Sequence, residues 1–328
     1  MHLSALTLLA TSLLTIPTLQ FPNYSRSSTP ETIYQFSNPT WIENIASLRN
    51  GSLLVSIIDR PELQLVHPST NQPSATLIHS FTCSTSVLGI TELAPDVFAV
   101  ISGNYTTTGG SVPGTYSVWN VDLNGPTAKV EKIAGVPEGQ LLNGIAALNE
   151  HTLLIADSNA GNVILLDTTT GKSEVVLDHE SMKPVPGAPI PIGINGLKIH
   201  DGYLYYTNSF QETLSRVKVD RKTGTAVGAF ETVATNLPLA DDFDVAKDGT
   251  AFVTQNYGNV VNRVGVDGKV EVIAGNLNSS VVAGPTGAVL GKTWRDMDVL
   301  YVSTTGGLGS PVNGTFTEGG KVVAVRVE

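Results

Sequence analysis

The sequence predicts an all-β fold, a six-bladed β-propeller whose blades each contain four strands, and two observations lead to it. First, six segments share one layout, in which a short apolar strand, a polar turn and a second apolar strand follow one another. Second, equivalent positions in these segments are 45, 55, 52, 46 and 45 residues apart. A period of roughly 40–50 residues that carries alternating strands is typical of propeller blades.

Each segment starts with a leading residue just ahead of its first strand. The clearest copies are "ENIASLRNGSLLVSIID" (43–59), "LLNGIAALNEHTLLIADS" (141–158), "GINGLKIHDGYLYYTNS" (193–209) and "DDFDVAKDGTAFVTQN" (241–256), and weaker copies occupy 88–103 and 286–304. The leading residues of the six blades are Glu43, Leu88, Asn143, Asn195, Asp241 and Thr286. Asn-Gly or Asp-Gly pairs between the two strands favour tight hairpin turns.

The segment before the first blade, "ETIYQF" (31–36), alternates as a strand should but precedes the first leading residue. We expect it to complete the sixth blade beside "GGKVVAVRVE" (319–328), which closes the ring and leaves no exposed sheet edge. The propeller domain is therefore expected to span residues 31–328, after a flexible leader at residues 21–30.

Residues 1–20 indicate a secretory signal peptide. They contain no Asp, Glu, Lys or Arg, and their apolar run from Leu3 to Ile16 is too short to span a bilayer. Secretion is also favoured by five Asn-x-Ser/Thr acceptor sites for N-glycosylation, at Asn23, Asn50, Asn104, Asn278 and Asn313. We therefore expect a glycoprotein that is secreted or stays in the secretory-pathway lumen, with no membrane span elsewhere.

Charge and cysteine content narrow the possible partners. The formal net charge is −10 and the chain has no basic run, which argues against nucleic acid as a partner. The single cysteine, Cys83, excludes an intramolecular disulfide. No histidine motif accompanies it, so we expect a buried apolar residue rather than a nucleophile.

Chain direction sorts the loops onto two faces of the predicted propeller. Successive strands of a blade alternate in direction, so the leading residues and the ends of the second strands should meet at one mouth of the central channel. The long loops at residues 102–117, 178–193 and 304–320 belong to the same face. Long loops gathered on one face of a rigid scaffold are a usual location for a binding site.

Four leading residues carry oxygen ligands to this mouth. Glu43, Asn143, Asn195 and Asp241 offer two carboxylates and two amides, a set that suits Ca²⁺ or another hard divalent cation. The alternative is that these side chains hydrogen-bond backbone groups at the strand starts, as Asn and Asp often do.

The repeats resemble the blade motifs of the SMP-30/gluconolactonase/LRE-like superfamily, which read approximately E-G-P-x-W, P-N-G-L-A and P-D-G-L-A. The resemblance rests on "ENIASLRNGSLLVS", "INGLKIHDGYLYYTNS" and "ADDFDVAKDGTAFV" and covers residues 31–328. It implies that Glu43, Asn195 and Asp241 bind a divalent metal and that Asn143 assists. The chain departs from these motifs at 44–45, where Asn-Ile replaces Gly-Pro, and at Asp242, which replaces Gly.

A lactonase of this superfamily is one functional hypothesis, and it needs a general base or a metal-bound hydroxide. Among the histidines, His67, His151 and His200 are predicted in turns on the far face, and His79 and His179 at the ends of outer strands. Asp241 is a further candidate base.

The chain as a whole resembles fungal secreted members of the superfamily, a group similar to the hetero-Diels–Alderases of tropolone–sesquiterpenoid biosynthesis. This resemblance implies a cycloaddition between a tropolone o-quinone methide and a humulene-type alkene, a reaction that needs no cofactor. It needs an apolar cavity, a few hydrogen bonds and protection from water. The candidate catalytic residues are Glu43, Asn143, Asn195 and Asp241, and the candidate substrate-binding residues are Arg60, Leu88, Tyr105, Asp157, Asn208, Phe210, Gln255, Tyr257 and Thr304.

Three hypotheses therefore remain open from the sequence. A cycloaddition catalyst should bind apolar small molecules and keep its activity in chelator. A metal-dependent lactonase should lose turnover when the metal is removed. A non-catalytic small-molecule-binding propeller should turn over neither class of substrate.

Overall fold

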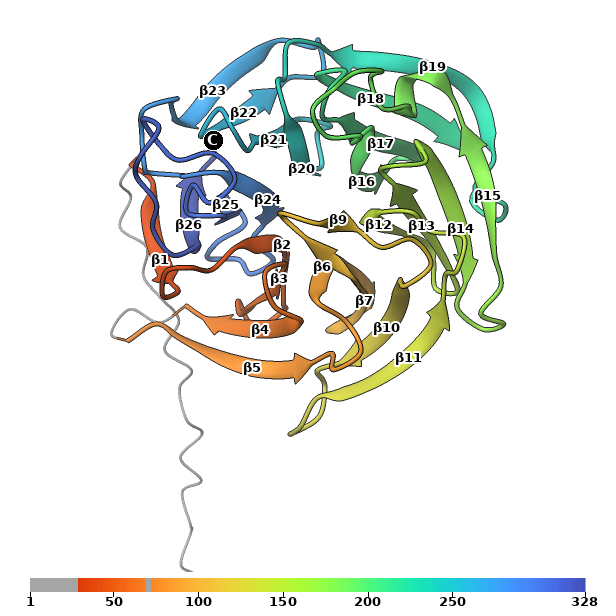
Figure 1. Cartoon of the computed structure of the whole chain (residues 1–328), viewed down its shortest axis with the longest axis horizontal. Helices are drawn as coiled ribbons and strands as arrows, with labels where there is room; N and C mark the ends of the chain where they lie inside the picture. Colours follow the sequence, from red (N-terminus) through yellow and green to blue (C-terminus); the bar gives the residue numbers. More distant parts are fainter. Residues whose placement is uncertain (1–28, 69–71, 328) are drawn as a thin grey trace, which may run out of the picture.

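Six four-stranded antiparallel sheets surround a central axis in the computed structural model, which describes residues 29–68 and 72–327 (Figure 1). The predicted propeller fold is confirmed. The expected signal peptide, most of the leader and Asn23 lie outside the described residues.

Each blade uses strands that follow one another along the chain, except in blade 2, where two short strands intervene between β7 and β10, and in blade 6, where the ring closes. Blade 1 contains β2 (Ile42–Ser47), β3 (Leu53–Ile57), β4 (Glu62–His67) and β5 (Ser74–Ser80). Blade 2 contains β6 (Ser86–Ala94), β7 (Val97–Gly103), β10 (Ser117–Asp122) and β11 (Lys129–Gly135). Blade 3 contains β12 (Leu142–Asn149), β13 (Thr152–Asp157), β14 (Asn162–Asp167) and β15 (Ser173–Asp178).

The remaining blades follow the same order. Blade 4 contains β16 (Ile194–His200), β17 (Tyr203–Asn208), β18 (Thr213–Val219) and β19 (Ala226–Ala234). Blade 5 contains β20 (Ala240–Val245), β21 (Ala251–Gln255), β22 (Val260–Val264) and β23 (Val270–Gly275). Blade 6 contains β24 (Pro285–Leu290), β25 (Val299–Thr304), β26 (Lys321–Arg326) and β1 (Glu31–Gln35).

The N-terminal strand closes the ring, as predicted. Strand β1 pairs with β26 in antiparallel register, from Glu31 opposite Ala324 to Gln35 opposite Lys321, and Figure 1 shows these two strands side by side in blade 6. Ile33 of β1 is buried in a cluster with residues of blades 1 and 6. Blade 6 therefore has four strands like the other blades, with β1 as its outermost strand, and it joins the N-terminal strand to the C-terminal strand in one sheet.

A β-bulge interrupts the first strand of every blade at the leading residue. The register shifts lie between Ile42 and Asn44, Val87 and Ile90, Leu142 and Ile145, Ile194 and Leu197, Ala240 and Phe243, and Pro285 and Gly287. A bulge inserts an extra residue and re-aims the neighbouring side chains. Hydroxyl groups of the second strands hold several bulges, since Ser56, Thr207 and Ser303 accept from the backbone N–H groups of Asn44, Gly196 and Gly287.

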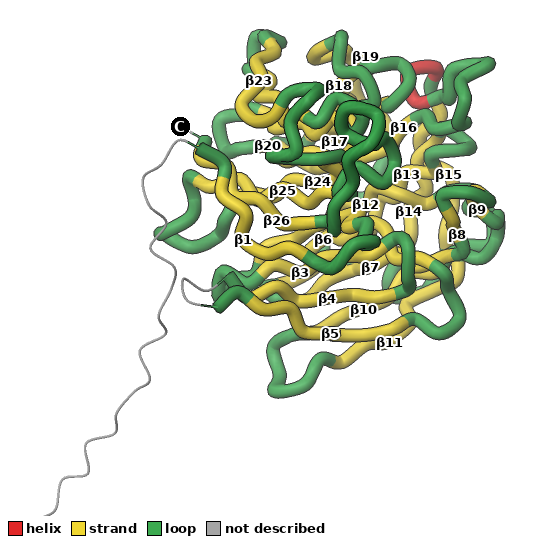
Figure 2. Tube along the Cα trace, turned by 60° about the vertical axis from the view of Figure 1, so that its left-hand side comes forward, coloured by secondary structure: helices red, strands yellow, loops and turns green. Residues whose placement is uncertain are grey.

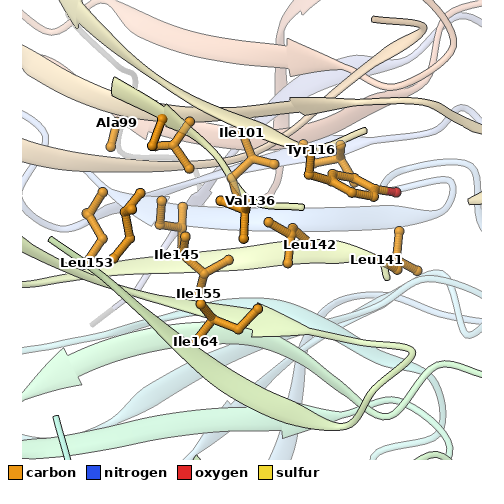
Figure 3. Close-up of a cluster of buried hydrophobic side chains, with 14 of the residues drawn as sticks. Ala99, Ile101, Tyr116, Val136, Leu141, Leu142, Ile145, Leu153, Ile155 and Ile164 are labelled. Atoms are coloured by element: carbon orange, nitrogen blue, oxygen red, sulfur yellow. The ribbon is translucent and has the colours of Figure 1, made fainter. Parts of the chain in front are cut away.

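Apolar residues pack between neighbouring blades. Figure 3 shows one such cluster, in which Ala99 and Ile101 of blade 2 lie next to Leu142, Ile145 and Leu153 of blade 3. Burying one Leu or Ile side chain in this way stabilises the fold by about 1.5–3 kcal/mol. Cys83, by contrast, is exposed in the turn after Phe81, so the expectation that it is buried was wrong.

Long connections on one face carry the few elements that are not blade strands. A small hairpin of β8 (Tyr105–Thr106) and β9 (Gly110–Ser111) lies between β7 and β10. Among the described residues the only helix is the short 3-10 helix η1 (Glu180–Met182), drawn in red in Figure 2. Accordingly, no helix in the described part of the chain is long and apolar enough to span a membrane.

Candidate functional site

Five of the six leading residues converge on a cavity of about 330 Å³ at one mouth of the channel, whereas Thr286 of blade 6 does not line it and donates to the carbonyl of Ile42. This volume falls near the lower end of the range for small-molecule sites, roughly 300–1,000 Å³. Eight of the residues predicted from the sequence line it, namely Glu43, Leu88, Tyr105, Asn143, Asn195, Phe210, Asp241 and Tyr257. The bulges explain this convergence, because they turn the leading side chains of blades 1 to 5 toward the axis.

The polar side chains at the base of the cavity, Glu43, Asn143, Asn195, Asp241 and Asn256, form what we call the floor. A hydrogen-bond network around Asp241 makes up one side of it. Asn195 Nδ2 lies 3.0 Å from Asp241 Oδ1, and Asn256 Nδ2 lies 3.3 Å from Asp241 Oδ2. Ser209 Oγ donates to the carbonyl of Ala240 at 2.8 Å, so it accepts from Asn195 Nδ2 at 3.0 Å. This chain of bonds fixes the orientation of the Asn195 amide, and both oxygens of Asp241 accept an amide N–H.

Glu43 lies across the floor from this network and is held by the indole of Trp41. Trp41 Nε1 donates to Glu43 Oε2 at 2.9 Å, and no donor among the described residues reaches Oε1. Burial raises the pKa of Glu43 to about 7. Burial, and then the charge of Glu43, also raise the pKa of Asp241 well above its usual range. Two neighbouring buried carboxyls resist double ionisation, so the pair holds a proton near neutral pH.

Two further polar groups of the cavity have no hydrogen-bond partner within the described residues, the side-chain amide of Asn143 and the hydroxyl of Tyr105. Burial, followed by the charge of Glu43, raises the pKa of Tyr105 to about 12, so its hydroxyl stays neutral and can donate. The carboxylate of Asp241 and the amide nitrogens of Asn195 and Asn256 are bonded to one another. The amide oxygens of Asn195 and Asn256 have no hydrogen-bond partner among the described residues, and Glu43 Oε1, Asn143 and Tyr105 are likewise open to a ligand.

Apolar side chains make up most of the remaining wall. They are Ile58, Leu88, Leu141, Ile190, Ile192, Phe210, Leu239 and Leu308, with the rings of Trp41 and Tyr257. The loop that follows β25 packs closely on this wall, because a Cβ added at Gly309 would lie 2.8 Å from Trp41 Cη2 and 3.3 Å from Tyr257 Cε1. The hairpin of β8 and β9 contributes Thr107 and Thr108 at the exposed rim. The site therefore combines a polar floor with an apolar wall.

Five residues predicted to bind substrate do not line this cavity. Asp157 accepts from the backbone N–H groups of residues 140, 141 and 160. Asn208 donates to the carbonyls of residues 181 and 183, Gln255 to that of residue 238, and Thr304 bonds the backbone of residue 321. Arg60 pairs with Glu62 at 2.9 Å. These side chains hold the loops and outer strands, which is why they are not available to the cavity.

The alternation of side chains along a strand explains part of this disagreement between the predicted and the observed lining residues. Ile58, Ser209 and Asn256 directly follow the ends of β3, β17 and β21, and these side chains line the cavity. Adjacent residues point to opposite sides, so the predictions at Asn208 and Gln255, one position before Ser209 and Asn256, select the wrong side. Trp41 also lines the cavity and was not predicted from the sequence, although it lies only two residues before Glu43. Leu141, Ile190, Ile192, Leu239 and Leu308 carried no signal beyond being apolar.

The two histidines expected nearest the mouth serve packing. His79 packs edge-on against Phe81 with ring centroids 4.7 Å apart. His179 stacks on Phe230 at 3.9 Å and accepts from the backbone N–H of Ser181 at the start of η1. Neither is among the residues that line the cavity.

The predicted cation ligands Glu43, Asn195 and Asp241 all line the cavity. Asn195 and Asn256 direct their amide nitrogens at Asp241, and their buried amide oxygens have no hydrogen-bond partner among the described residues, so donors that suit a hard cation are available there. Within residues 29–68 and 72–327, no group of three or more His, Cys, Asp or Glu side chains is close enough together to hold a metal ion. Binding of Ca²⁺ by these residues stays a prediction.

Comparison with known proteins shows what the chain is similar to. It is 29% identical over 334 residues to a protein of Phoma sp named "Putative hetero-Diels-Alderase", covering 92% of this chain and 94% of that protein. It is 28% identical to "Putative hetero-Diels-Alderase asR5" of Sarocladium schorii, covering 83% and 77%. The chain resembles hetero-Diels–Alderases. This confirms the resemblance that the sequence as a whole had indicated. No protein-family model matches the chain.

Solved structures confirm the fold. The chain matches a luciferin-regenerating enzyme with a TM-score of 0.63 and 15% identity, covering 92% of this chain and 99% of that one. It matches a regucalcin of Agrobacterium tumefaciens, described as a calcium-binding protein, with a TM-score of 0.62 and 15% identity, covering 90% and 93%. Both are propellers of the SMP-30/gluconolactonase/LRE-like type expected from the motifs.

Proposed function

We propose that this protein catalyses an intermolecular hetero-Diels–Alder cycloaddition between a tropolone o-quinone methide and a humulene-type sesquiterpene. The observation that carries the proposal is the make-up of the cavity, in which a buried carboxyl with a raised pKa and an unbonded amide lie at the base of an apolar wall. The similarity to proteins named as hetero-Diels–Alderases supports it.

The polar floor is the place for the heterodiene. Protonated Glu43 donates from Oε1 to the carbonyl oxygen of the quinone methide, and this bond strengthens as negative charge builds on that oxygen. A preorganised donor in a water-poor site stabilises such charge far better than solvent does. The Asn143 amide and the Tyr105 hydroxyl supply further hydrogen bonds and fix the orientation of the ring.

The apolar wall is the place for the alkene. Leu88, Phe210 and Leu308 offer dispersion contacts to a hydrocarbon that has no polar group of its own. In the cycloaddition one C–C and one C–O bond form as three π bonds reorganise, and no electron, proton or co-reactant is lost or gained. Holding the two partners in register supplies most of the catalysis, at the limit about 7–11 kcal/mol of the barrier.

The proposed reaction therefore needs no resident cofactor. A divalent-metal-dependent lactonase is the second candidate, favoured by the carboxylates of the floor and by the fold of the calcium-binding regucalcin. A binding propeller without turnover is the third. We also propose that the protein enters the secretory pathway, on the basis of the apolar N-terminal segment and the five acceptor sites.

The test uses the purified mature protein, a humulene-type alkene, and a quinone methide released in situ from a tropolone precursor with a benzylic-type leaving group. Chiral chromatography measures the rate and the isomer ratio of the cycloadduct, with heat-denatured protein as the control. We expect acceleration and enrichment of one stereoisomer. Rates and ratios equal to those of the control contradict the proposal, and hydrolysis of an aldonolactone with added Ca²⁺ instead supports the lactonase.

A further inference from the structure

The second residue of each first-strand bulge differs between blades in a way that points to a positioning device. Four blades carry glycine there, at Gly89, Gly144, Gly196 and Gly287, whereas blade 1 carries Asn44 and blade 5 carries Asp242.

Close packing between adjacent first strands explains the glycines. A Cβ at Gly89 would overlap the carbonyl oxygen of Asn143 in the next blade, and a Cβ at Gly144 would overlap that of Asn195. A Cβ at Gly196 would overlap Oδ1 of Asp242. Glycine is therefore the residue that lets neighbouring blades meet at the axis. Asn44 and Asp242 depart from this pattern because their side chains have a different use.

Those two side chains bond to each other between blades that are not neighbours in the ring. Asn44 Nδ2 donates to Asp242 Oδ2 at 2.8 Å, across a separation of 198 residues. Blade 6 lies between blades 5 and 1, and a Cβ added at its Gly287 would lie 2.9 Å from Ser303 Oγ and 3.4 Å from the Cα of Asn44. Both residues are buried, with exposed fractions of 3% and 4%.

A third blade completes the link. Lys198 of β16 donates from Nζ to both oxygens of Asp242, at 3.1 and 3.0 Å, and the backbone N–H of Phe243 donates to Oδ1 at 2.8 Å. The carboxylate is thus satisfied on every side, as a buried charge must be. We name the set Asn44, Lys198 and Asp242 the cross-brace.

The cross-brace lies directly beneath the cavity floor. Asn44 and Asp242 follow Glu43 and Asp241 in the chain. Farther along the same strands, Ile45 and Asp244 line a second cavity of about 720 Å³ at the opposite mouth, as does Lys198. Neither Asn44 nor Asp242 lines either cavity. The bond between Asn44 and Asp242 therefore lies between the two cavities of the channel.

We propose that Asp242 is a positioning residue that closes the floor of the substrate cavity and sets the separation of Glu43 and Asp241. The hydrogen bond between Asn44 and Asp242 fixes the backbone at residues 43 and 241, which carry the carboxyl groups of the site. The catalytic consequence rests on the proposed function. A loosened floor misplaces the hydrogen-bond donor relative to the alkene, and a displacement of about 1 Å can lower the rate about 100-fold.

The main variant is Asp242→Gly, which restores the residue type of four other blades, with Asp242→Asn as the conservative rescue. We expect Asp242→Gly to lower kcat about 10- to 100-fold with a smaller change in KM, and to move the stereoisomer ratio toward that of the uncatalysed reaction. Asp242→Asn keeps the shape and a bond to Asn44, so it should retain more of the wild-type ratio. Lys198→Met removes the two bonds from Lys198 to Asp242. Its kcat and isomer ratio should lie between those of the two Asp242 variants.

The control is Arg216→Met, which removes an outer ion pair of blade 4 with Glu231 at 2.8 Å and should leave kcat and the ratio unchanged. A lower melting temperature with unchanged kcat, KM and isomer ratio in Asp242→Gly and Lys198→Met overturns the proposal, since that is a purely structural role. If Asp242→Gly does not fold, Lys198→Met and Asp242→Asn decide by the same criteria.

A crystal structure separates this proposal from the proposed function. In Asp242→Gly, or in Lys198→Met if the former does not fold, we expect an altered spacing of Glu43 and Asp241 and a passage between the two cavities. An unchanged floor overturns the positioning role whatever the activity. Absence of cycloaddition by the wild-type protein, together with an opened floor in the variant, rejects the proposed function alone.

Discussion

The indole nitrogen of Trp41 lies 2.9 Å from Oε2 of Glu43, and this one bond orients the carboxyl at the floor of the cavity. With Oε2 accepting from Trp41, Oε1 is left to carry the proton and face a ligand. The same tryptophan belongs to the apolar wall, where its ring meets the loop at Gly309. Wall and floor are therefore joined by a single side chain.

Activity should depend on the proton of Glu43. Because burial raises the pKa of Glu43 to about 7, the donor form predominates below that pH and is lost above it. We expect the wild-type rate of cycloaddition to fall as the pH rises through about 7. Glu43→Gln, which keeps a weaker donor, should be about 10- to 100-fold slower and largely independent of pH, as a pH–rate profile of both proteins will show.

The same pKa predicts the pH dependence of stability. Between the ordinary value of 4.5 and about 7, folded Glu43 holds a proton that the unfolded chain releases. The free energy of unfolding should therefore decrease as the pH rises through this window, by on the order of 3 kcal/mol for the site. Urea titrations across pH 4 to 8 check this, and equal slopes for wild type and Glu43→Gln would contradict the raised pKa.

A charge in the apolar wall should damage the cycloaddition. Phe210→Asp places a charge where the alkene lies, at a partly buried position, so we expect a loss of at least about 100-fold in kcat/KM, about 2.7 kcal/mol. Leu88→Arg should cause a similar loss and should also lower the melting temperature, because Leu88 is 1% exposed within the apolar core. Leu277→Arg, at an exposed position outside the cavity, is the matched control and should have wild-type activity. Steady-state kinetics with a melting curve for each variant distinguish lost catalysis from lost folding.

Chelation separates the two chemistries. If the floor acts through hydrogen bonds, activity after treatment with EDTA and desalting should stay within about twofold of the untreated enzyme, because the reaction needs no Lewis acid. Complete loss on chelation, restored by Ca²⁺, would refute the cofactor-independent account and promote the lactonase. Asp241→Asn then serves as a second probe, since it removes the charge of the proposed ligand while keeping the size of the side chain.

Closure by β1 should be essential for stability. Deleting residues 21–36 removes the pairing with β26 and exposes the apolar cluster around Ile33, so we expect the melting temperature to fall by about 10 °C or more. Deleting residues 21–28 alone, which leaves β1 intact, is the control and should change it by less than about 2 °C. Equal melting temperatures for the two deletions would rule out a closing role for β1.

Several acceptor sites should carry glycans after eukaryotic secretion. Asn50, Asn278 and Asn313 are exposed, and Asn104 is half-buried at the base of the β8–β9 hairpin. Intact-mass spectrometry before and after endoglycosidase treatment measures their occupancy, with protein from a bacterial cytosol as the unglycosylated control. An unchanged mass for the secreted sample would show these sites to be unused.

Local patterns in the sequence determined the blades and the leading residues. The repeat period gave six blades, and the turn pairs placed the hairpins, because both depend on residues close together in the chain. Glu43, Asn143, Asn195 and Asp241 share one position in the repeat, so geometry that repeats around an axis brings them to one mouth. The orphan strand at Glu31 was also recognisable, since a sheet edge needs a partner.

Tertiary structure alone decided which polar side chains are open to a ligand and which are bonded. Asp157 and Asn208 look like site residues in the sequence but are taken up by backbone groups of the loops. Asn44 and Asp242 look like ordinary substitutions in a repeat, yet they meet across 198 residues. Periodicity fixes where a residue stands in its blade, whereas its hydrogen-bond partner comes from a distant segment that is placed only when the ring closes.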